Sequence, residues 1–238
     1  TQKISNLEGH IKKDLIGESP PIKELINIIN KIKDTDATVL ITGESGTGKE
    51  LIAQKIHTSS NRADKPFVAI NCAAMPGDLL ESELFGYRKG TFTGAYKDEI
   101  GIIRRADNGT LLLDEIGEMD LRLQSKLLRF LQDKEVRSVG DDKTYKVDVR
   151  IICSTNRNLK KEVEEGNFRE DLFYRINVIN LIAPPLRERL EDLELLVPYF
   201  IEKYNISFNK NIKGITEKAY EQLRNYSFEG NIRELENI

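Results

Sequence analysis

The sequence contains few of the residues that build disulfide or metal frameworks. Its 238 residues include two cysteines, two histidines and no tryptophan. Cys72 and Cys153 lie in unrelated contexts, and neither has a histidine at a metal-binding spacing. His10 and His57 form no cluster. These counts exclude a disulfide scaffold and a hydrolase whose metal is held by histidine and cysteine. We predict that both cysteines are reduced, buried and hydrophobic in character.

Long apolar runs and an excess of basic residues are also missing. No run of about 18 or more apolar residues occurs, which excludes a transmembrane helix, and the first residues lack the apolar core of a signal peptide. The 36 Lys and Arg residues are outnumbered by 39 Asp and Glu residues, for a net charge of −3. This balance argues against direct nucleic-acid binding by the chain. We therefore expect a cytoplasmic protein without a membrane partner.

Hydrophobic patterning predicts strands that alternate with helices. Apolar runs typical of buried strands occupy residues 39–41, 67–70, 110–114, 147–153 and 178–182. Helical periodicity of apolar residues occupies 22–32, 51–56 and 123–131. Alternation of this kind implies parallel strand pairing through right-handed crossovers, with helices on both faces of the sheet. The sequence thus predicts a three-layer α/β domain around a five-stranded parallel sheet.

The character of the sequence changes after Pro184 and Pro185. No further strand pattern appears, and the apolar residues follow helical spacing. We predict a linker over 1–14, the α/β domain over 15–184 and a small helical unit over 185–238. The helical unit is expected to be incomplete, because its last helix begins near Asn231 and is cut off within about two turns.

A glycine-rich loop follows the first predicted strand and precedes a helix. Its residues fit the pattern G-x-x-x-x-G-K and are Gly43, Glu44, Ser45, Gly46, Thr47, Gly48 and Lys49. Glycines allow backbone N–H groups to surround phosphate oxygens, and the helix N-terminus adds positive potential. We therefore predict a nucleotide site in which Lys49 neutralises the β and γ phosphates. The next position usually carries a hydroxyl that binds Mg²⁺, but here it is Glu50, which could bind the metal through water or point away.

An acidic pair at the end of the third predicted strand supplies a metal ligand. Asp114 and Glu115 follow the apolar residues 110–113. This placement predicts that Asp114 binds Mg²⁺ near the phosphates and that Glu115 polarises an attacking water. Because Glu115 has no clear role in static binding, the pair indicates ATP hydrolysis.

Several motifs together give the chain a specific resemblance. They are G-E-S-G-T-G-K-E at 43–50, E-S-E-L-F-G at 81–86, G-T-F-T-G-A at 90–95, G-T-L-L-L-D-E-I-G-E at 109–118, F-R-E-D-L-F-Y-R at 168–175, P-P-L-R-E-R at 184–189 and G-N-I-R-E-L at 230–235. From about Leu15 onward the chain resembles the central AAA+ domain of sigma-54-dependent transcriptional activators, in which Glu50 is the usual residue after the lysine. The helical unit would then be the AAA+ lid.

The resemblance implies an activity and a partner. It implies a homo-oligomeric ring, a hexamer or heptamer, that hydrolyses ATP with Mg²⁺ and remodels RNA polymerase carrying sigma-54 at a closed promoter. The contact to sigma-54 would be the loop Gly90, Thr91, Phe92, Thr93, Gly94 and Ala95. DNA would be bound only through a domain outside this chain, and the chain would be the central fragment of a longer activator.

The resemblance also assigns roles to residues of the nucleotide site. Asn71 matches a residue that hydrogen-bonds the catalytic glutamate in one nucleotide state, and Asn156 matches a sensor of the γ-phosphate. Arg169 and Arg175 match arginines presented to the ATP of the neighbouring subunit. In addition, the resemblance places Ile16 and Gly17 along the adenine, and Arg233 as the lid arginine that reads the nucleotide.

Two positions depart from the family pattern. Thr91 stands where alanine is usual, and a branched hydroxyl residue in a tight loop is expected to alter the loop conformation. Phe228, Glu229 and Gly230 stand where Trp-Pro-Gly is more common, and without the proline we expect that turn to be less fixed.

Two other functions fit part of the same pattern. A clamp-loader or protein-unfolding AAA+ ATPase would share the phosphate loop and the acidic pair, but it would have no use for the loop at 90–95. A nucleotide-gated scaffold, or a repressor with a decayed ATPase, would not need Lys49, Asp114, Glu115 and both arginines. ATP turnover that rises with protein concentration would favour the ring enzyme.

Overall fold

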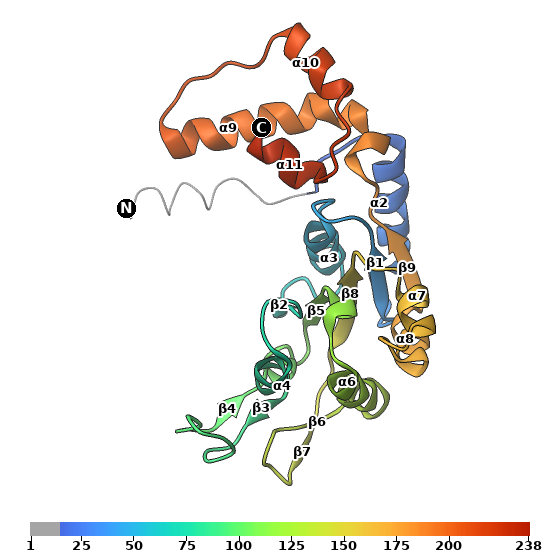
Figure 1. Ribbon diagram of the computed structural model, residues 1–238, viewed down its shortest axis with the longest axis vertical. Helices are drawn as coiled ribbons and strands as arrows, with labels where there is room; N and C mark the ends of the chain where they lie inside the picture. The colour runs from blue at the N-terminus through green and yellow to red at the C-terminus, as the bar shows by residue number, and fades with distance from the viewer. Residues whose placement is uncertain (1–14) are drawn as a thin grey trace.

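The computed structural model describes residues 15–238, and the predicted linker over 1–14 lies outside them. At its centre a five-stranded parallel sheet has the order β2-β5-β8-β1-β9 (Figure 1). The strands are β1 (Val39–Thr42), β2 (Phe67–Asn71), β5 (Thr110–Asp114), β8 (Arg150–Thr155) and β9 (Ile179–Ile182). All five predicted strands are therefore present, with shifted boundaries for all of them except β5.

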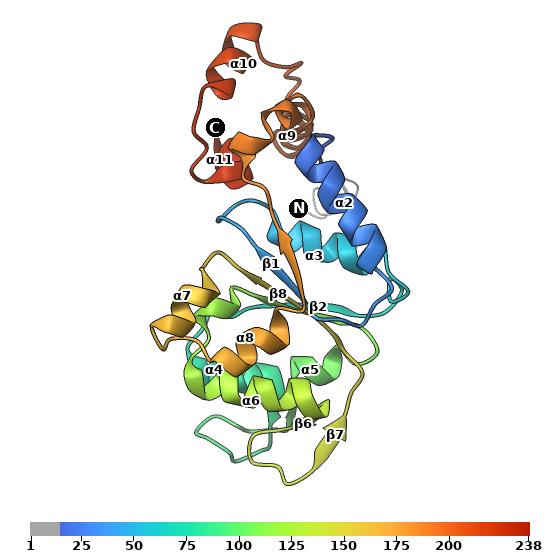
Figure 2. The ribbon, with the colours of Figure 1, turned by 90° about the vertical axis from the view of Figure 1, so that its right-hand side faces the viewer.

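Helices cover both faces of the sheet, as Figure 2 shows. One face carries α2 (Pro20–Ile32) and α3 (Lys49–Thr58), and the other carries α4 (Gly77–Phe85), α5 (Ile102–Arg105), α6 (Leu121–Asp133), α7 (Leu159–Glu164) and α8 (Glu170–Ile176). Strand residues alternate between the two cores: Val39 and Ile41 pack with α2 and α3, and Leu40 packs on the opposite side. The predicted three-layer α/β fold is confirmed.

Two small antiparallel hairpins extend the α/β layer at the end far from the C-terminal helices (Figure 1). They pair β3 (Gly86–Tyr87) with β4 (Glu99–Ile100), and β6 (Glu135–Arg137) with β7 (Thr144–Lys146). An isolated parallel bridge between Tyr87 and Val139 joins the hairpins. Neither hairpin was predicted, because strands of two or three residues are too short to show a period.

The strand predicted over 147–153 begins later and ends later than expected. Val147 and Val149 are buried, but they precede β8, which starts at Arg150. Between them the amide of Asp148 donates to Asp107 Oδ1 at 2.8 Å, so this stretch is held by a loop and not by the sheet. The alternation of apolar residues thus predicted the buried positions correctly, but the strand boundary predicted from it is wrong.

The residues after β9 form helices around a core of their own. They are η2 (Leu186–Glu188), η3 (Leu190–Asp192), α9 (Leu193–Phe208), α10 (Glu217–Arg224) and α11 (Asn231–Asn237). Leu186, Leu193, Leu196, Phe228 and Leu235 form the buried centre of this lid. No helix within residues 15–238 is long and apolar enough to cross a membrane.

Both cysteines are free and buried, as predicted. Burial raises the pKa of the Cys72 thiol to about 12, and burial likewise raises the pKa of Cys153. A thiol with such a pKa is not a nucleophile near neutral pH. The two residues therefore serve packing.

Candidate active site

The glycine-rich loop connects β1 to α3 and surrounds the side chain of Lys49. The Lys49 ammonium is 6% exposed and donates to the carbonyl oxygens of Gly43 at 3.0 Å and Glu44 at 3.3 Å. Gly48 caps the N-terminus of α3 with φ of 93°, a left-handed conformation that glycine adopts without strain. The loop thus places a cation and the positive end of a helix at one point, the combination that binds phosphate groups.

Asp114 lies at the carboxyl end of β5, between two neighbouring strands. Its Oδ1 accepts a hydrogen bond from Ser154 Oγ of β8 at 2.6 Å, and its Oδ2 accepts one from Asn71 Nδ2 of β2 at 3.0 Å. These bonds fix the carboxylate at the edge of the sheet, where parallel α/β sheets bind ligands. Ser154 was not singled out from the sequence, since a serine inside an apolar strand gives no signal of its contact.

Glu115 has a strained backbone and contacts two parts of the site. Its φ and ψ of 51° and 50° lie in the left-handed region, which is uncommon for a residue with a side chain and clusters at functional sites. Its Oε1 lies 3.4 Å from Lys49 Nζ, and its Oε2 accepts from the backbone amide of Asn156 at 3.0 Å. The carboxylate is therefore held next to the phosphate loop.

The two predicted asparagines lie beside the acidic pair. Asn71 donates to Asp114 and not to Glu115, and its own Oδ1 accepts from the amide of Ala73 at 2.8 Å. Asn156 reaches Glu115 through its backbone, and its exposed side chain lies at the end of β8. The restraint of Glu115 by Asn71 in another nucleotide state stays a prediction.

The lid touches the phosphate loop through the start of α11. Arg233 Nη1 donates to Ser45 Oγ at 3.1 Å, and the amide of Ile232 donates to the carbonyl of Gly46 at 3.0 Å. A Cβ on Gly46 would meet the carbonyl oxygen of Gly230 at 2.1 Å, so only glycine fits this contact. Arg233 thus lies at the phosphate loop, and its role in reading the nucleotide stays a prediction.

Other bonds hold the turn that lacks the usual proline. The buried Asn231 accepts from the amide of Leu186 at 2.8 Å through its Oδ1, and its Nδ2 donates to the carbonyl of Ser45 at 3.0 Å. The amide of Gly230 donates to Glu234 Oε2 at 2.8 Å. The turn is therefore tied both to the base of the lid and to the phosphate loop.

A charge pair between the loop and the lid was missed by sequence reasoning. Arg187 donates to both carboxylate oxygens of Glu44, at 2.6 and 2.8 Å. Hydrogen bonds from Arg187 and then Asn231 lower the pKa of Glu44 to about 2. A bidentate pair of this kind fixes relative orientation. The only available signal was that Glu44 and Arg187 both lie inside family motifs.

Glu50, Ile16 and Gly17 lie on the other side of the loop. Glu50 is exposed and accepts from Gln54 Nε2 at 3.2 Å, along its own helix. Ile16 lines a cavity of about 190 Å³ with Leu15, Thr47, Gly48, Glu50, Leu51, Leu196, Tyr199, Phe200, Lys203, Ile232 and Glu236. Gly17 follows Ile16 and packs against Arg189 and Asp192. This cavity, which we call the nucleoside cavity, adjoins the phosphate loop, and the placement of the adenine along Ile16 and Gly17 stays a prediction.

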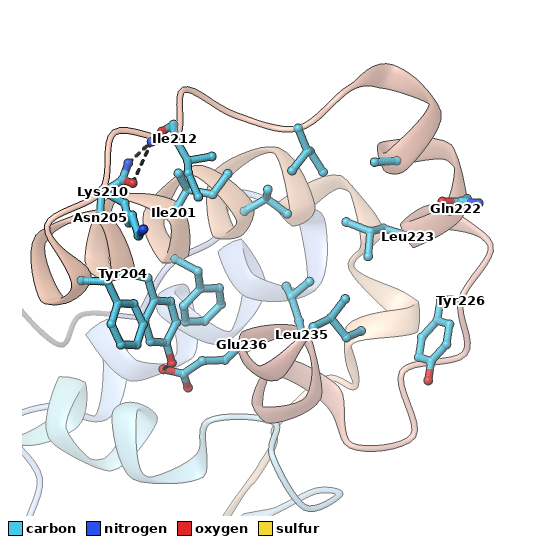
Figure 3. Close-up of a pocket in the computed structure, with 16 residues that line it drawn as sticks. Ile201, Tyr204, Asn205, Lys210, Ile212, Gln222, Leu223, Tyr226, Leu235 and Glu236 are labelled. Carbon is cyan, nitrogen blue, oxygen red and sulfur yellow. Dashed lines mark hydrogen bonds between the residues drawn. The ribbon is translucent and has the colours of Figure 1, made fainter.

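A larger apolar cavity, of about 600 Å³, lies inside the lid between α9, α10 and α11 (Figure 3). Its wall carries Tyr204, Leu223 and Leu235, and none of the phosphate-loop residues lines it. It adjoins the smaller cavity, since Phe200 and Glu236 line both.

Arg169 precedes α8 as its N-cap residue, and Arg175 lies in the last turn of the same helix. Arg169 pairs with Asp171 at 2.7 Å and donates to Ser125 Oγ at 3.2 Å, and Arg175 donates to the carbonyl of Leu131 at 3.1 Å. Both side chains are exposed. Within residues 15–238 neither arginine bonds to the phosphate loop or to the acidic pair.

The loop of residues 90–95 lies between β3 and β4, at the end of the molecule opposite the lid (Figure 1). Gly90, Thr93 and Gly94 are exposed, whereas Ala95 is buried. The Phe92 side chain is 44% exposed, and its ring centroid lies 4.9 Å from that of Tyr87. Phe92 is thus partly displayed and partly packed on its own hairpin.

The donor set at Asp114 fits Mg²⁺. This ion is usually held by one or two carboxylates together with substrate phosphates and water. Asp114 supplies the carboxylate, fixed by Ser154 and Asn71, within the same end of the sheet as Lys49. No group of three or more His, Cys, Asp or Glu side chains within residues 15–238 could hold a metal without such phosphates.

Comparison with known proteins agrees with this geometry. Residues 15–182 match the model of the sigma-54 interaction domain, and residues 187–238 match an AAA+ ATPase lid domain. The chain belongs to the sigma-54 interaction domain family. It is 54% identical to the regulatory protein AtoC of Escherichia coli over 97% of this chain and 49% of that protein. It is 52% identical to the Nif-specific regulatory protein of Enterobacter agglomerans over 94% of this chain and 43% of that protein. The chain spans about half the length of these curated relatives.

Solved structures give the same fold. The crystal structure of NtrX from Brucella abortus in complex with ADP superimposes with a TM-score of 0.90 at 37% identity, over 99% of this chain and 53% of that one. The same protein in complex with ATP gives a TM-score of 0.88 at 38% identity. Hsp104 of S. cerevisiae, at 19% identity and a TM-score of 0.63, shares the fold alone.

Proposed function

We propose that this AAA+ domain hydrolyses ATP as a ring and uses the cycle to remodel RNA polymerase carrying sigma-54 at a closed promoter. The observation that carries the proposal is the convergence of Lys49, Asp114 and Glu115 at one edge of the sheet, beside a cavity of about 190 Å³ that adjoins the phosphate loop. The matches to two family models, and the structure of a 38% identical protein in complex with ATP, support the same proposal.

Different residues of this chain have different roles in the reaction. The phosphate loop and Lys49 bind the β and γ phosphates, and Ile16 and Gly17 lie along the adenine. A bound Mg²⁺ would be held by Asp114 and would neutralise charge on the phosphates. Glu115 orients the attacking water and accepts its proton. Asn156 senses the γ-phosphate, and Asn71, which here donates to Asp114, restrains Glu115 in another nucleotide state.

The neighbouring subunit completes the site. Arg169 and Arg175 project from α8 and contact no part of their own phosphate loop in the described chain. In the ring, each would reach the ATP of the next subunit, where a guanidinium stabilises charge on the transferred phosphoryl oxygens. Arg233 contacts Ser45 and reports the nucleotide state to the lid.

The contact to sigma-54 is the loop of residues 90–95. Phe92 is displayed at the end opposite the lid, beside Arg88 and Lys89. The loop lies after α4 and β3 and before β4. Changes at the nucleotide would reach it through Asn71 and the segment 72–85.

The catalytic part of the proposal is tested by Glu115→Gln. This variant should bind ATP as the wild type does and lose at least about a hundredfold in turnover, because the general base is gone. Glu118→Gln is the matched control, since it makes the same chemical change at a residue paired with Arg157. Unchanged turnover in Glu115→Gln would contradict the assignment.

The partner is tested by capture of sigma-54 with a transition-state analogue of ATP. Wild-type protein should retain sigma-54, and Phe92→Ala should retain ATP turnover while losing capture. Leu79→Ala is the control, because Leu79 is 51% exposed on α4 and lies outside the loop. Failure of the wild type to retain sigma-54 would leave an ATPase of another remodelling class.

A further inference from the structure

A buried ion pair ties the segment before α2 to the base of the lid. Arg189 Nε donates to Asp192 Oδ2 at 2.8 Å, and the two side chains are 0% and 1% exposed. Asp192 also accepts from the amides of Glu18 at 2.7 Å and Ser19 at 2.9 Å, and from Ser19 Oγ at 2.7 Å. Arg189 Nη2 donates to the carbonyl of Ile16 at 2.5 Å. Residues 173 or 174 positions apart are thus joined by one cluster.

Gly17 shows how closely the chain passes the pair. Its φ is +151°, and a Cβ there would meet Asp192 Oδ2 at 2.6 Å and Arg189 Nη2 at 2.8 Å. Contacts of that length are shorter than any side chain tolerates, so glycine is required by both conformation and space. The backbone at Ile16 and Gly17 is therefore set directly by the ion pair.

The ion pair does not itself line the nucleoside cavity. That cavity has Ile16 on one wall and Gly48 of the phosphate loop and Tyr199 of α9 on others. Arg189 and Asp192 lie behind Ile16, so they act on the cavity only through the segment they hold. A residue with this placement positions a binding group and makes no contact with the ligand.

A purely stabilising role explains the pair poorly. Removing two charges from water carries a large desolvation cost, and apolar replacements of buried pairs are often neutral or stabilising. Arg189 Nη1 is buried and has no hydrogen-bond partner in the described residues, which adds to that cost. Burial raises the pKa of Asp192, but the hydrogen bonds from Ser19 and Glu18 outweigh it and leave the pKa below its ordinary value. The carboxylate is therefore ionised at neutral pH and fully engaged in holding the segment.

We infer that Arg189 and Asp192 are positioning residues that hold Ile16 and Gly17 against the base of the nucleotide and thereby fix the lid to the same base. The inference rests on the proposed ATP site. Its consequence is that the affinity contributed by the base and the affinity contributed by the phosphates are separable by mutation at Asp192.

The test compares two probes on the full 238-residue chain. ADP carries the base, whereas inorganic tripolyphosphate carries only the phosphates. In Asp192→Asn the dissociation constant of ADP should rise about tenfold, while that of tripolyphosphate stays within about twofold. In steady-state turnover the KM for ATP should rise by a similar factor with little change in kcat. A merely structural loss would weaken both probes together.

Three further variants keep the result decisive. Ser19→Ala removes one hydrogen bond to Asp192 and leaves the ion pair, so the dissociation constant of ADP should rise about threefold. This variant keeps the test available even if Asp192→Asn folds poorly. The double change Arg189→Met, Asp192→Leu removes both buried charges, so it should recover stability without recovering ADP affinity. Glu194→Gln breaks an exposed ion pair with Arg224 in the lid and should change the affinity for neither probe.

The outcomes separate the inference from the function it rests on. If the wild type binds neither probe, the proposed ATP site is wrong and the inference falls with it. If the wild type binds both and Asp192→Asn binds ADP equally well, the site stands and the positioning role is overturned.

Discussion

The hydroxyl oxygen of Thr91 lies 3.3 Å from the carbonyl oxygen of Val139, which belongs to the other hairpin. The same hydroxyl donates to the carbonyl of Arg88, and the amide of Arg88 donates to Val139 at 3.0 Å. Arg88 Nε adds a bond to Asp141 Oδ2 at 2.8 Å. The residue that departs from the family pattern is therefore part of the junction between the two hairpins.

Removal of that hydroxyl should loosen the loop without altering the nucleotide site. Thr91→Val keeps the branched Cβ and loses the hydrogen bonds, which are worth about 0.5–1.5 kcal/mol. Amide hydrogen exchange over residues 88–96 should therefore rise about threefold to tenfold. Thr93→Val, at an exposed position of the same loop, should leave exchange unchanged. Equal exchange in Thr91→Val and the wild type would show that the hydroxyl does not restrain the loop.

Arg150 should be important for stability because its buried side chain caps the C-terminus of α2. Its side chain is buried, and it donates to the carbonyls of Lys33 and, at 2.9 Å, of Ile32 at the C-terminus of α2. Arg150→Ala removes both hydrogen bonds and opens a cavity, although the Ile32 carbonyl still accepts from the amide of Thr35 at 3.1 Å. The free energy of unfolding should therefore fall by about 3–5 kcal/mol. Urea unfolding measures this loss. Arg129→Ala, at an arginine 85% exposed on α6, should cost less than about 0.5 kcal/mol.

His57 should make stability depend on pH between neutrality and mild acid. Its Nδ1 lies 3.0 Å from Thr110 Oγ1, and burial lowers its pKa from 6.5. The unfolded chain therefore binds the proton first, so the contribution of neutral His57 is complete above pH 6.5 and is lost as the pH falls toward the lowered value.

The measurement is the free energy of unfolding of wild type and His57→Gln from pH 7.5 to 5. The wild type should lose stability over this range more steeply than the variant. His10→Gln is the control, because His10 is the other histidine and lies outside the described residues. If His57→Gln keeps the full slope, the dependence belongs to other groups.

Mixing two inactive variants tests whether the arginines act between subunits. The double change Arg169→Ala, Arg175→Ala and the single change Glu115→Gln should each abolish most turnover. In a mixed ring, a site with wild-type Glu115 can face a neighbour with wild-type arginines, so mixing should restore part of the activity. Arginines that served their own subunit would give no recovery on mixing.

Much of the fold was predictable because apolar runs report burial. Leu111 to Leu113 are fully buried, and the run predicted both β5 and the position of Asp114 at its end. The phosphate loop was predictable because glycine spacing reflects a required backbone shape. The contacts of Asn71 were not, since adjacent carboxylates at 114 and 115 are both within reach of a neighbouring strand.

The sequence did not allow us to predict which charged residues are buried inside the protein. Arg150, Arg189 and Asp192 are almost completely buried, yet each reads as a surface residue in the sequence. Apart from the Arg189–Asp192 pair itself, they bond mostly to backbone carbonyls and amides far along the chain, which leave no periodic signal. Likewise the packing of Phe92 on Tyr87 depends on a hairpin too short to predict.

The place of β1 in the sheet has a consequence for how the protein is made. β1 leads into the phosphate loop, but both of its neighbours, β8 and β9, begin at Arg150 and Ile179. A ribosome adds about 5–20 residues per second, so the apolar strand Val39–Thr42 emerges long before either partner exists. Pairing across such a separation is slow and leaves hydrophobic surface open to aggregation. We therefore expect the nucleotide site to be among the last parts of the α/β layer to assemble, only after β9 has left the ribosome.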